Sequence, residues 1–241
     1  MAALLNRDEI EADFARQLAK VQGPQREELR QLLGSPPDIN RVPLEFWQRV
    51  EEENRKRITA ILLLIFLTSS DQHSGGIADD ATRLQAEQQG LAWAVKRGAD
   101  LAKDFTDRST EWLRTKAAKW QGTSVSSPVA PTEPPPAPQE AEIESDLRDI
   151  FGPVRQENMA ISETTQAASA GGEWMMHALG GTSELDQWHT EHDAKVCPIC
   201  KPLDKTRRSV WSLKFPAGPP AHPRCRCYID YAKDFSRADE N

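Results

Sequence analysis

The sequence predicts an α+β protein in three parts: an N-terminal helical region, a proline-rich linker and a small C-terminal domain of mixed helices and strands. Three observations support this expectation. Apolar residues recur at helical spacing over most of residues 1–121, and residues 122–140 contain six prolines without a hydrophobic period. All four cysteines lie within residues 197–227, inside the expected C-terminal domain 141–241. A chain of 241 residues has room for two domains, since one domain commonly takes roughly 100–200 residues.

The first two helices are expected from the spacing of apolar residues. The first is marked by apolar positions at intervals of four, four and three, namely Ile10, Phe14, Leu18 and Val21. Gly23-Pro24 is expected to interrupt it, because proline breaks the ladder of helical hydrogen bonds. A second helix is expected to begin after Pro43 and to include the apolar run 58–67. A loop is expected at residues 69–76, which contain Ser-Ser-Asp and Gly-Gly.

A long third helix is expected over residues 77–121. Its apolar stripe falls near a seven-residue repeat, at Leu84, Leu91, Val95, Ala102, Phe105 and Trp112. Polar residues and a glycine interrupt the repeat, so a packed helical hairpin or bundle is expected rather than a free coiled coil. After the linker, a short helix over 143–150 is expected to stop at Gly152-Pro153. Another is expected to run to about residue 170, where Gly171-Gly172 is expected to break it.

The linker and the charge pattern limit the classes of protein that fit. Residues 122–140 are expected to form an extended spacer, because so few apolar residues cannot offset the entropy lost on ordering. The net charge is −7, but residues 195–227 hold eight basic residues and one acidic residue, so this segment carries +7 and the remainder −14. A basic module on an acidic chain suits contact with a polyanion or with an acidic protein face.

Targeting and membrane segments are not expected. The N-terminus lacks the charged start, apolar stretch and cleavage site of a secretory signal, so a cytosolic product is expected. The apolar run 58–67 is about half of the ~20 residues that a membrane-spanning helix needs. No membrane span is therefore predicted.

The cysteines form two closely spaced pairs, Cys197-x2-Cys200 and Cys225-x-Cys227, separated by twenty-four residues. A Cys-x2-Cys turn directs two thiolates at one point, and a second pair completes a tetrahedron around Zn(II) at about 2.3 Å. In so short a segment, zinc can replace a core that the chain cannot build. The sequence therefore predicts a zinc-knuckle-type module at residues 188–228.

The fourth metal ligand is open between two residues. Cys197, Cys200 and Cys225 are the first candidates, and either Cys227 or His222 closes the set, because an extended Cys-x-Cys directs its side chains to opposite sides. Two disulfides are the alternative, which a reducing cytosol disfavours. A redox Cys-x2-Cys of the thioredoxin type is disfavoured, since no parallel βαβ pattern surrounds it.

Three further residues are expected to support the module. Trp188 is expected to cover the metal and exclude water, or to pack in the core. Asp193 is expected to hydrogen-bond backbone amides or a histidine ligand of the metal. Glu163 is expected to form a buried pair with Arg224 or Arg226, which would hold its helix against the module.

The order of residues around the cysteines carries further information. Residues 188–203 read Trp-His-Thr-Glu-His-Asp-Ala-Lys-Val-Cys-Pro-Ile-Cys-Lys-Pro-Leu, and residues 219–227 read Pro-Pro-Ala-His-Pro-Arg-Cys-Arg-Cys. This order resembles the closing signature of the phage Mu F-like head-morphogenesis proteins, in which Trp, Thr, Asp and Val-Cys-x2-Cys precede Pro-Pro-x-His-Pro-x-Cys-Arg-Cys. Upstream, residues 160–171 resemble the Ala-x-Thr-Glu helix of that family, with Ser162 in place of Thr. Lys205 stands where the family often has glycine.

The resemblance covers residues 141–230, and residues 1–122 contribute nothing to it. It implies a minor head protein that acts in capsid assembly and head morphogenesis. Such a protein is expected to associate with the portal and with capsid and scaffold proteins at the capsid interior, and to accompany DNA ejection. The resemblance implies a place in the virion, and in the host cytoplasm during assembly.

Two other classes of function are alternatives. A nucleic-acid-binding zinc adaptor would contact phage DNA through a basic loop. The residues expected to make that contact are Lys201, Arg207, Arg208 and Lys214. A metal-dependent nuclease would draw on His189, His192 and Asp193, but four cysteines make a closed, structural coordination sphere and no His-Glu-x-x-His motif is present. No catalytic residue is therefore predicted, and the chain is not expected to be an enzyme.

Overall fold

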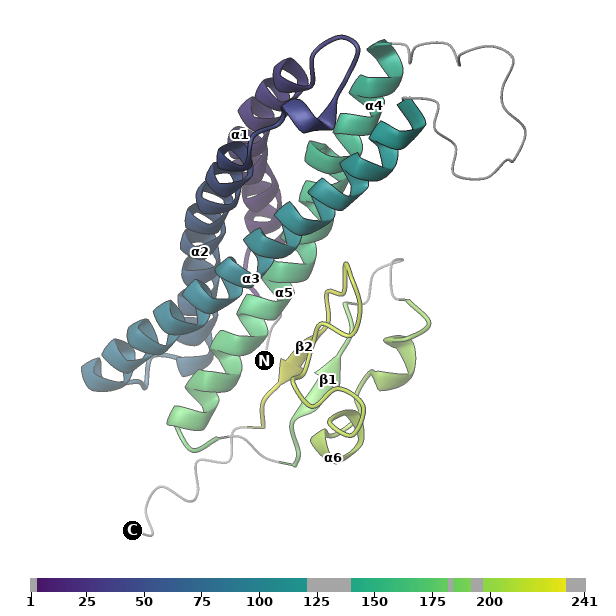
Figure 1. Cartoon of the computed structure of the whole chain (residues 1–241). Coiled ribbons are helices and arrows are strands. Elements are labelled where there is room, and N and C mark those ends of the chain that lie inside the picture. The colour runs from purple at the N-terminus through teal and green to yellow at the C-terminus, as the bar shows by residue number, and fades with distance from the viewer. Residues whose placement is uncertain (1–3, 121–139, 182–183, 192–196, 233–241) are drawn as a thin grey trace. The chain divides into compact units, whose positions relative to one another are not determined.

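The computed structural model describes residues 4–120, 140–181, 184–191 and 197–232. These residues are mostly helical, and their two strands form one small sheet (Figure 1). The expectation of an α+β protein is confirmed at this level. Within the described ranges, no helix is long and apolar enough to cross a membrane.

Four long helices account for most of the described chain. In chain order the elements are α1 (Arg7–Leu33), η1 (Ile39–Arg41), α2 (Leu44–Ser74), α3 (Asp80–Trp120), α4 (Glu140–Phe151), α5 (Pro153–Ala178), β1 (Gln187–His189), η2 (Lys201–Leu203), α6 (Arg208–Trp211) and β2 (Tyr228–Asp230). The helices expected after Pro43, over 77–121 and over 143–150 are confirmed as α2, α3 and α4. The start of α2 directly after Pro43 and the start of α5 at Pro153 follow from the preference of proline for the first turn of a helix.

The expected interruption of the first helix was wrong, because α1 continues through Gly23 and Pro24. A proline ring clashes with the β-carbon of the residue before it when that residue is helical. Gly23 has no β-carbon, so this part of the steric cost of Pro24 is absent. The apolar side chains on either side of the proline, Leu18 and Leu29, are fully buried, and their burial favours one continuous helix.

The expected loop at 69–76 and the expected break at Gly171-Gly172 were also wrong. Helix α2 continues to Ser74 because its serines bond the backbone of α5: the Ser69 hydroxyl donates to the Ala168 carbonyl at 2.7 Å, and the Ser70 hydroxyl donates to the Gly171 carbonyl at 3.0 Å. The glycines of α5 permit this close approach. A β-carbon at Gly171 would lie 2.2 Å from the Phe66 carbonyl oxygen.

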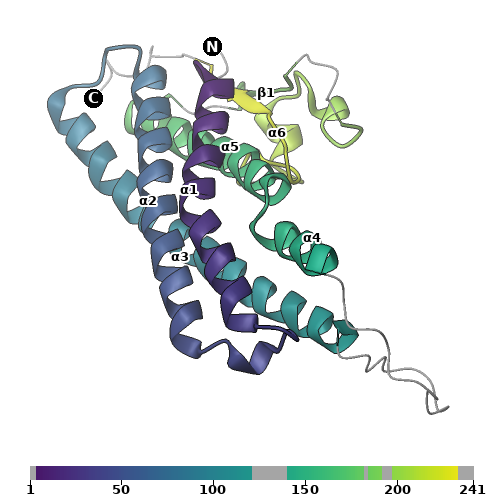
Figure 2. The ribbon, with the colours of Figure 1, turned by 90° about the horizontal axis from the view of Figure 1, so that it is seen from above.

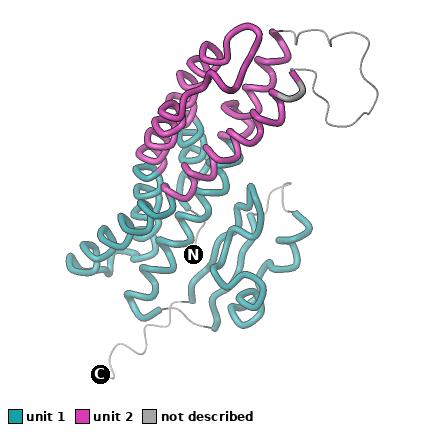
Figure 3. The backbone as a smooth tube through the Cα atoms, in the orientation of Figure 1, with its two compact units in different colours: residues 1–15, 59–97, 157–241 teal, residues 16–58, 98–156 magenta. Residues whose placement is uncertain are grey.

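Packing divides the chain into two compact units (Figure 3). Unit 1 contains residues 1–15, 59–97 and 157–241, and unit 2 contains residues 16–58 and 98–156. Residues of the expected N-terminal region thus contribute to both units, and the units do not follow the division at the linker. The expected linker 122–140 lies outside the described residues except at Glu140, where α4 begins.

Within unit 2, α1 and α2 run antiparallel (Figure 2). Gln22 donates to Asn54 at 3.0 Å, and Glu28, further along α1, pairs with Arg49, earlier in α2. Residues further along α1 thus pair with residues earlier in α2, as they do between antiparallel helices. The core of this unit contains Phe46, Val50, Phe105, Leu113, Leu147, Ile150 and Phe151.

Within unit 1, a two-stranded antiparallel sheet joins the two ends of the cysteine-rich segment. Trp188 of β1 pairs with Ile229 of β2, and both side chains are buried while their strand neighbours are only partly buried. This alternation places one face of the sheet in the core. The Trp188 carbonyl also accepts a hydrogen bond from the Lys205 amide at 2.7 Å. Strand β1 therefore has backbone partners on both of its edges.

Candidate metal centre

The first cysteine pair lies in a tight turn that leads into η2. The amides of Cys200 and Lys201 both donate to the Cys197 carbonyl, at 3.2 and 3.0 Å. The Cys200 amide also lies 3.4 Å from the Cys197 sulfur. These hydrogen bonds close the turn from within. They place both sulfurs on one side of it, as the Cys-x2-Cys spacing predicts.

The second pair follows another turn, built from His222-Pro223-Arg224. The Cys225 amide donates to the His222 carbonyl at 3.1 Å, and Arg224 has a left-handed backbone with φ of 61°. This tight turn brings His222 to the same side as Cys225. Cys227 lies immediately before β2, so the sheet fixes where the pair ends.

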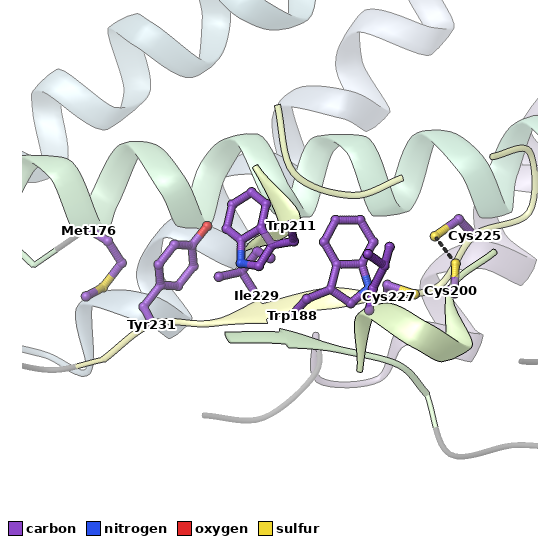
Figure 4. Close-up of a cluster of buried hydrophobic side chains, with 9 residues drawn as sticks. Met176, Trp188, Cys200, Trp211, Cys225, Cys227, Ile229 and Tyr231 are labelled. Carbon is purple, nitrogen blue, oxygen red and sulfur yellow. Dashed lines mark hydrogen bonds between the residues drawn. The ribbon is translucent and has the colours of Figure 1, made fainter. Parts of the chain in front are cut away.

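The two turns bring five donors into two overlapping groups that share Cys200: Cys197, Cys200 and His222 form one, and Cys200, Cys225 and Cys227 the other. Figure 4 shows the three cysteines of the second group. His222 Nε2 lies 2.8 Å from the Cys197 sulfur and 3.1 Å from the Cys200 sulfur, and the Cys200 and Cys225 sulfurs are 3.7 Å apart. Four sulfurs at about 2.3 Å from one zinc would stand about 3.8 Å from each other. Cys227 lies within 4.8 Å of both Cys200 and Cys225. This cluster could hold a metal ion.

The histidine is oriented as a metal ligand usually is. His222 Nδ1 lies 2.7 Å from the Pro223 carbonyl oxygen, which can only accept, so Nδ1 carries the proton. Nε2 is then the ring nitrogen that faces the two sulfurs of Cys197 and Cys200. Metal-binding histidines are commonly held by such a bond from the other ring nitrogen.

The buried thiols do not ionise independently. Burial raises the pKa of Cys200 to about 12. The hydrogen bond between the two thiols of the Cys-x-Cys pair lowers the pKa of Cys225 to about 5 and, together with burial, raises the pKa of Cys227. Of these three thiols, Cys225 is the one whose ionisation its surroundings favour. A bound cation would displace the other protons, because thiolates are the metal-binding form.

An aromatic cluster covers the buried side of the centre (Figure 4). Trp188 is fully buried in the same cluster as Cys200, Cys225 and Cys227, and its ring lies 5.9 Å from Trp211 and 5.6 Å from Phe215, measured between centroids. The indole N–H of Trp188 favours the thiolate form of Cys227 and so opposes the rise in the pKa of that thiol. The two groups make no hydrogen bond of ordinary geometry. The expectation that Trp188 packs in the core is thus confirmed, and the covering of a metal stays a prediction.

On the other side, the donors form the floor of a cavity of about 330 Å³. Its walls are charged: Asp8, Glu11 and Glu191 supply acids, and Arg224 and Arg226 supply bases. The Arg226 guanidinium pairs with Asp8 and lies 3.3 Å from Glu11. The walls of this cavity therefore include the first two turns of α1.

The expected pairing of Glu163 with Arg224 or Arg226 was wrong. Glu163, which is buried, accepts two hydrogen bonds from Arg97 of α3, at 2.9 and 2.6 Å. Arg224 instead donates to Asn158. A carboxylate buried this deeply needs a cation held in a fixed geometry. Arg97 of α3 is that cation, and no spacing in the sequence indicates the pairing.

The other residues singled out by sequence divide into three groups. Lys201, Arg207 and Lys214 are exposed on the module, whereas Arg208 is paired with Glu173 at 2.8 Å and with Asp186 at 3.1 Å. His189 stacks on Tyr228, and Asp204 and Asp230 each lie 4.0 Å from one of its ring nitrogens. His192 and Asp193 lie outside the described residues.

Sequence reasoning missed the residues that hold the second turn from outside, Arg7, Ser162 and Thr165. Arg7 carries no sequence signal for this role, because it lies 219 residues from the carbonyl that it bonds. Ser162 and Thr165 lie in the segment that resembles the Ala-x-Thr-Glu helix. That resemblance was the available signal, although it did not indicate what the hydroxyl groups contact.

The fold and this centre define a mostly helical protein with a sulfur-rich site able to hold a metal ion. Comparisons of the chain with protein-family models, with curated proteins and with solved structures find no match. The resemblance to the Mu F-like head-morphogenesis proteins therefore rests on the motif residues alone.

Proposed function

We propose that the cluster is a structural zinc site and that the chain is a phage minor head protein acting in capsid assembly. One observation carries the zinc proposal: donors from two turns, twenty-four residues apart in sequence, gather in two overlapping groups that share Cys200, and the Cys200 and Cys225 sulfurs are 3.7 Å apart, close to the sulfur spacing of a tetrahedral zinc site. Thiolate and imidazole donors favour zinc over magnesium or calcium, which prefer oxygen.

The ligand set proposed is Cys197, Cys200, Cys225 and His222. His222 takes the fourth position because its Nε2 lies nearest to the first two sulfurs and its other nitrogen is held by a carbonyl. Cys227 is then the fifth donor, a neighbour that acts through its hydrogen bond with Cys225.

Metal analysis of the purified, reduced, full-length protein tests this proposal. One zinc per chain is expected, and Cys197→Ser should lose the metal together with the folded state of residues 197–232. His222→Ala should weaken zinc binding more than Cys227→Ser. Protein that stays folded without metal under strong reductant would contradict a structural zinc.

The role in head assembly is supported by the order of motif residues around the metal centre, which resembles that of Mu F-like proteins. Its partners are proposed to be the portal protein and the capsid and scaffold proteins. Co-expression of the full-length chain with the portal and scaffolded procapsid of its phage, followed by sedimentation, tests the proposal. The protein should sediment with particles, and its absence from them at every expression level would count against a head protein.

A nucleic-acid adaptor is a second candidate, favoured by the exposed side chains of Lys201, Arg207 and Lys214. Exposed cations bind phosphates by releasing counterions, so binding of duplex DNA should weaken steeply with salt. If the protein binds no DNA at low salt, the adaptor function is contradicted, and these charges only keep the loop solvated. Turnover of the DNA would instead support the nuclease alternative.

A further inference from the structure

The backbone of the second turn is held by side chains from two distant helices. Ser162 of α5 accepts a hydrogen bond from the Arg224 amide at 2.8 Å. Thr165, one turn further along α5, donates to the Cys225 carbonyl at 2.5 Å. Arg7 of α1 donates to the Arg226 carbonyl at 2.8 Å. Three consecutive residues of the turn are thus each fixed by one side chain.

These bonds form a connected chain rather than three separate contacts. A second nitrogen of Arg7 donates to the Thr165 hydroxyl, which in turn donates to the carbonyl of Cys225. The Arg7 side chain is only 6% exposed, and its Nε donates to Glu11 at 2.6 Å. A buried guanidinium is costly unless its donors are satisfied, so Arg7 favours the arrangement in which the turn occupies its present place.

The turn itself needs such support. Arg224 has a left-handed backbone, which residues with a β-carbon adopt at a cost, and this residue lies between the donors His222 and Cys225. The following Cys-x-Cys pair does not converge on one point by its spacing alone. Contacts from outside the turn therefore set where its donors point.

The same contacts place the N-terminus of α1. Arg226, in the middle of the Cys-x-Cys pair, pairs with Asp8 and lies 3.3 Å from Glu11. Together with Arg7, these residues bond the first two turns of α1 to the turn that carries the metal donors. All of them belong to unit 1.

From this arrangement we infer that Arg7, Ser162 and Thr165 are positioning residues for the metal donors, and that metal binding and docking of the first two turns of α1 are thermodynamically linked. The inference rests on the proposed metal site. By reciprocity, if docking of α1 strengthens metal binding, then metal binding strengthens docking of α1 by the same factor.

Metal affinity of full-length variants tests the positioning role. Thr165→Val keeps the shape of the side chain but removes the hydroxyl, and should weaken zinc binding, measured by competition with a chelator, by about 10–100-fold. Thr165→Ser, which restores the hydroxyl, should recover most of the affinity. Arg7→Gln should weaken binding in the same range, whereas Arg30→Gln, at an exposed pair on the same helix, should not.

The absorption spectrum of Co(II) bound in place of zinc supplies a readout that general destabilisation does not change. Its ligand-field bands should shift in Thr165→Val, because Cys225 is displaced, and should keep the wild-type position in Arg30→Gln. Wild-type affinity and an unshifted spectrum in Thr165→Val would overturn the positioning role. Wild-type protein that binds neither zinc nor Co(II) would instead overturn the proposed metal site.

The reciprocal effect is measured on the wild-type protein, so it does not depend on the folding of any variant. Removal of zinc with a chelator should increase amide hydrogen exchange in residues 7–15 at least tenfold, while exchange in residues 18–33 of the same helix changes little. An equal increase along the whole of α1 would overturn the linkage, as would unchanged exchange in residues 7–15 after the metal is lost.

Discussion

Gly171→Ala is expected to destabilise the protein, although alanine is the better helix former. The added β-carbon would lie 2.2 Å from the Phe66 carbonyl oxygen and 2.9 Å from its carbon, whereas ordinary contacts begin at 3.4 Å. Both neighbours are backbone atoms, so a side-chain rotation cannot relieve the clash. The α5 backbone would have to move away from α2 by about 1.2 Å locally.

The magnitude follows from three contributions. Overpacking of this kind costs about 1–3 kcal/mol. The displacement would also stretch the hydrogen bond from Ser70 to the Gly171 carbonyl, now 3.0 Å, at a cost of about 1 kcal/mol. Replacing glycine in a helix returns about 1 kcal/mol. The net loss in the free energy of unfolding is about 1–3 kcal/mol, which corresponds to roughly 2–12 °C in Tm for a chain of this size.

Chemical denaturation of the full-length protein measures this loss, with Gly172→Ala as the matched control. A β-carbon at Gly172 meets the His73 ring at 2.9 Å, and a ring can rotate where a carbonyl cannot. The control should therefore lose less stability than Gly171→Ala. Equal stability of the wild type and Gly171→Ala would refute the close approach of α2 and α5 as the reason for glycine at this position.

Three other perturbations have defined outcomes. Arg97→Gln leaves the buried Glu163 without its cation and should cost about 2–4 kcal/mol in the free energy of unfolding, measured by denaturation; a loss under about 1 kcal/mol would mean that water replaces the pair. Burial raises the pKa of Tyr231 well above its usual value near 10, so the unfolded state ionises first and stability should fall as pH rises above about 10. Tyr231→Phe should flatten that decline in denaturation measured against pH, and an unchanged slope would assign it to other groups. If the chain binds DNA, replacing the exposed basic residues by glutamine should lower the slope of log affinity against log salt by about three, and a slope unchanged by this triple replacement would contradict the assignment. The residues to replace are Lys201, Arg207 and Lys214. Arg208→Gln should leave the slope unchanged, because that guanidinium is held by two acids.

Features that depend on neighbouring residues could be predicted from the sequence. The apolar spacing predicts the long helices, and the two pairs of cysteines predict the donor cluster. Both are local, since a helical stripe or a Cys-x2-Cys turn is defined within a few residues. His222, three residues before Cys225, belongs to the same kind of signal.

Features that depend on contacts between distant segments could not be predicted. Gly171 was expected to end a helix, because glycine is a poor helix former in isolation. In the fold it allows two backbones to meet, and that packing outweighs the propensity. The partner of Glu163 was sought in the module, but it lies on α3, and nothing in the spacing of charges along one chain identifies which arginine will face a buried acid.

The hydrogen bond between Arg7 and the Arg226 carbonyl has a consequence for biosynthesis, because it joins groups 219 residues apart. Translation exposes the first turns of α1 long before the turn that completes their surroundings exists. Contacts of such large sequence separation form late, since the intervening chain must be ordered first. The segment that the ribosome makes first should therefore be among the last to reach its final place, and loading of the proposed metal site should follow release of the finished chain. Arrest of translation before residue 226 should leave the first turns of α1 open to protease however long the arrested chain is held.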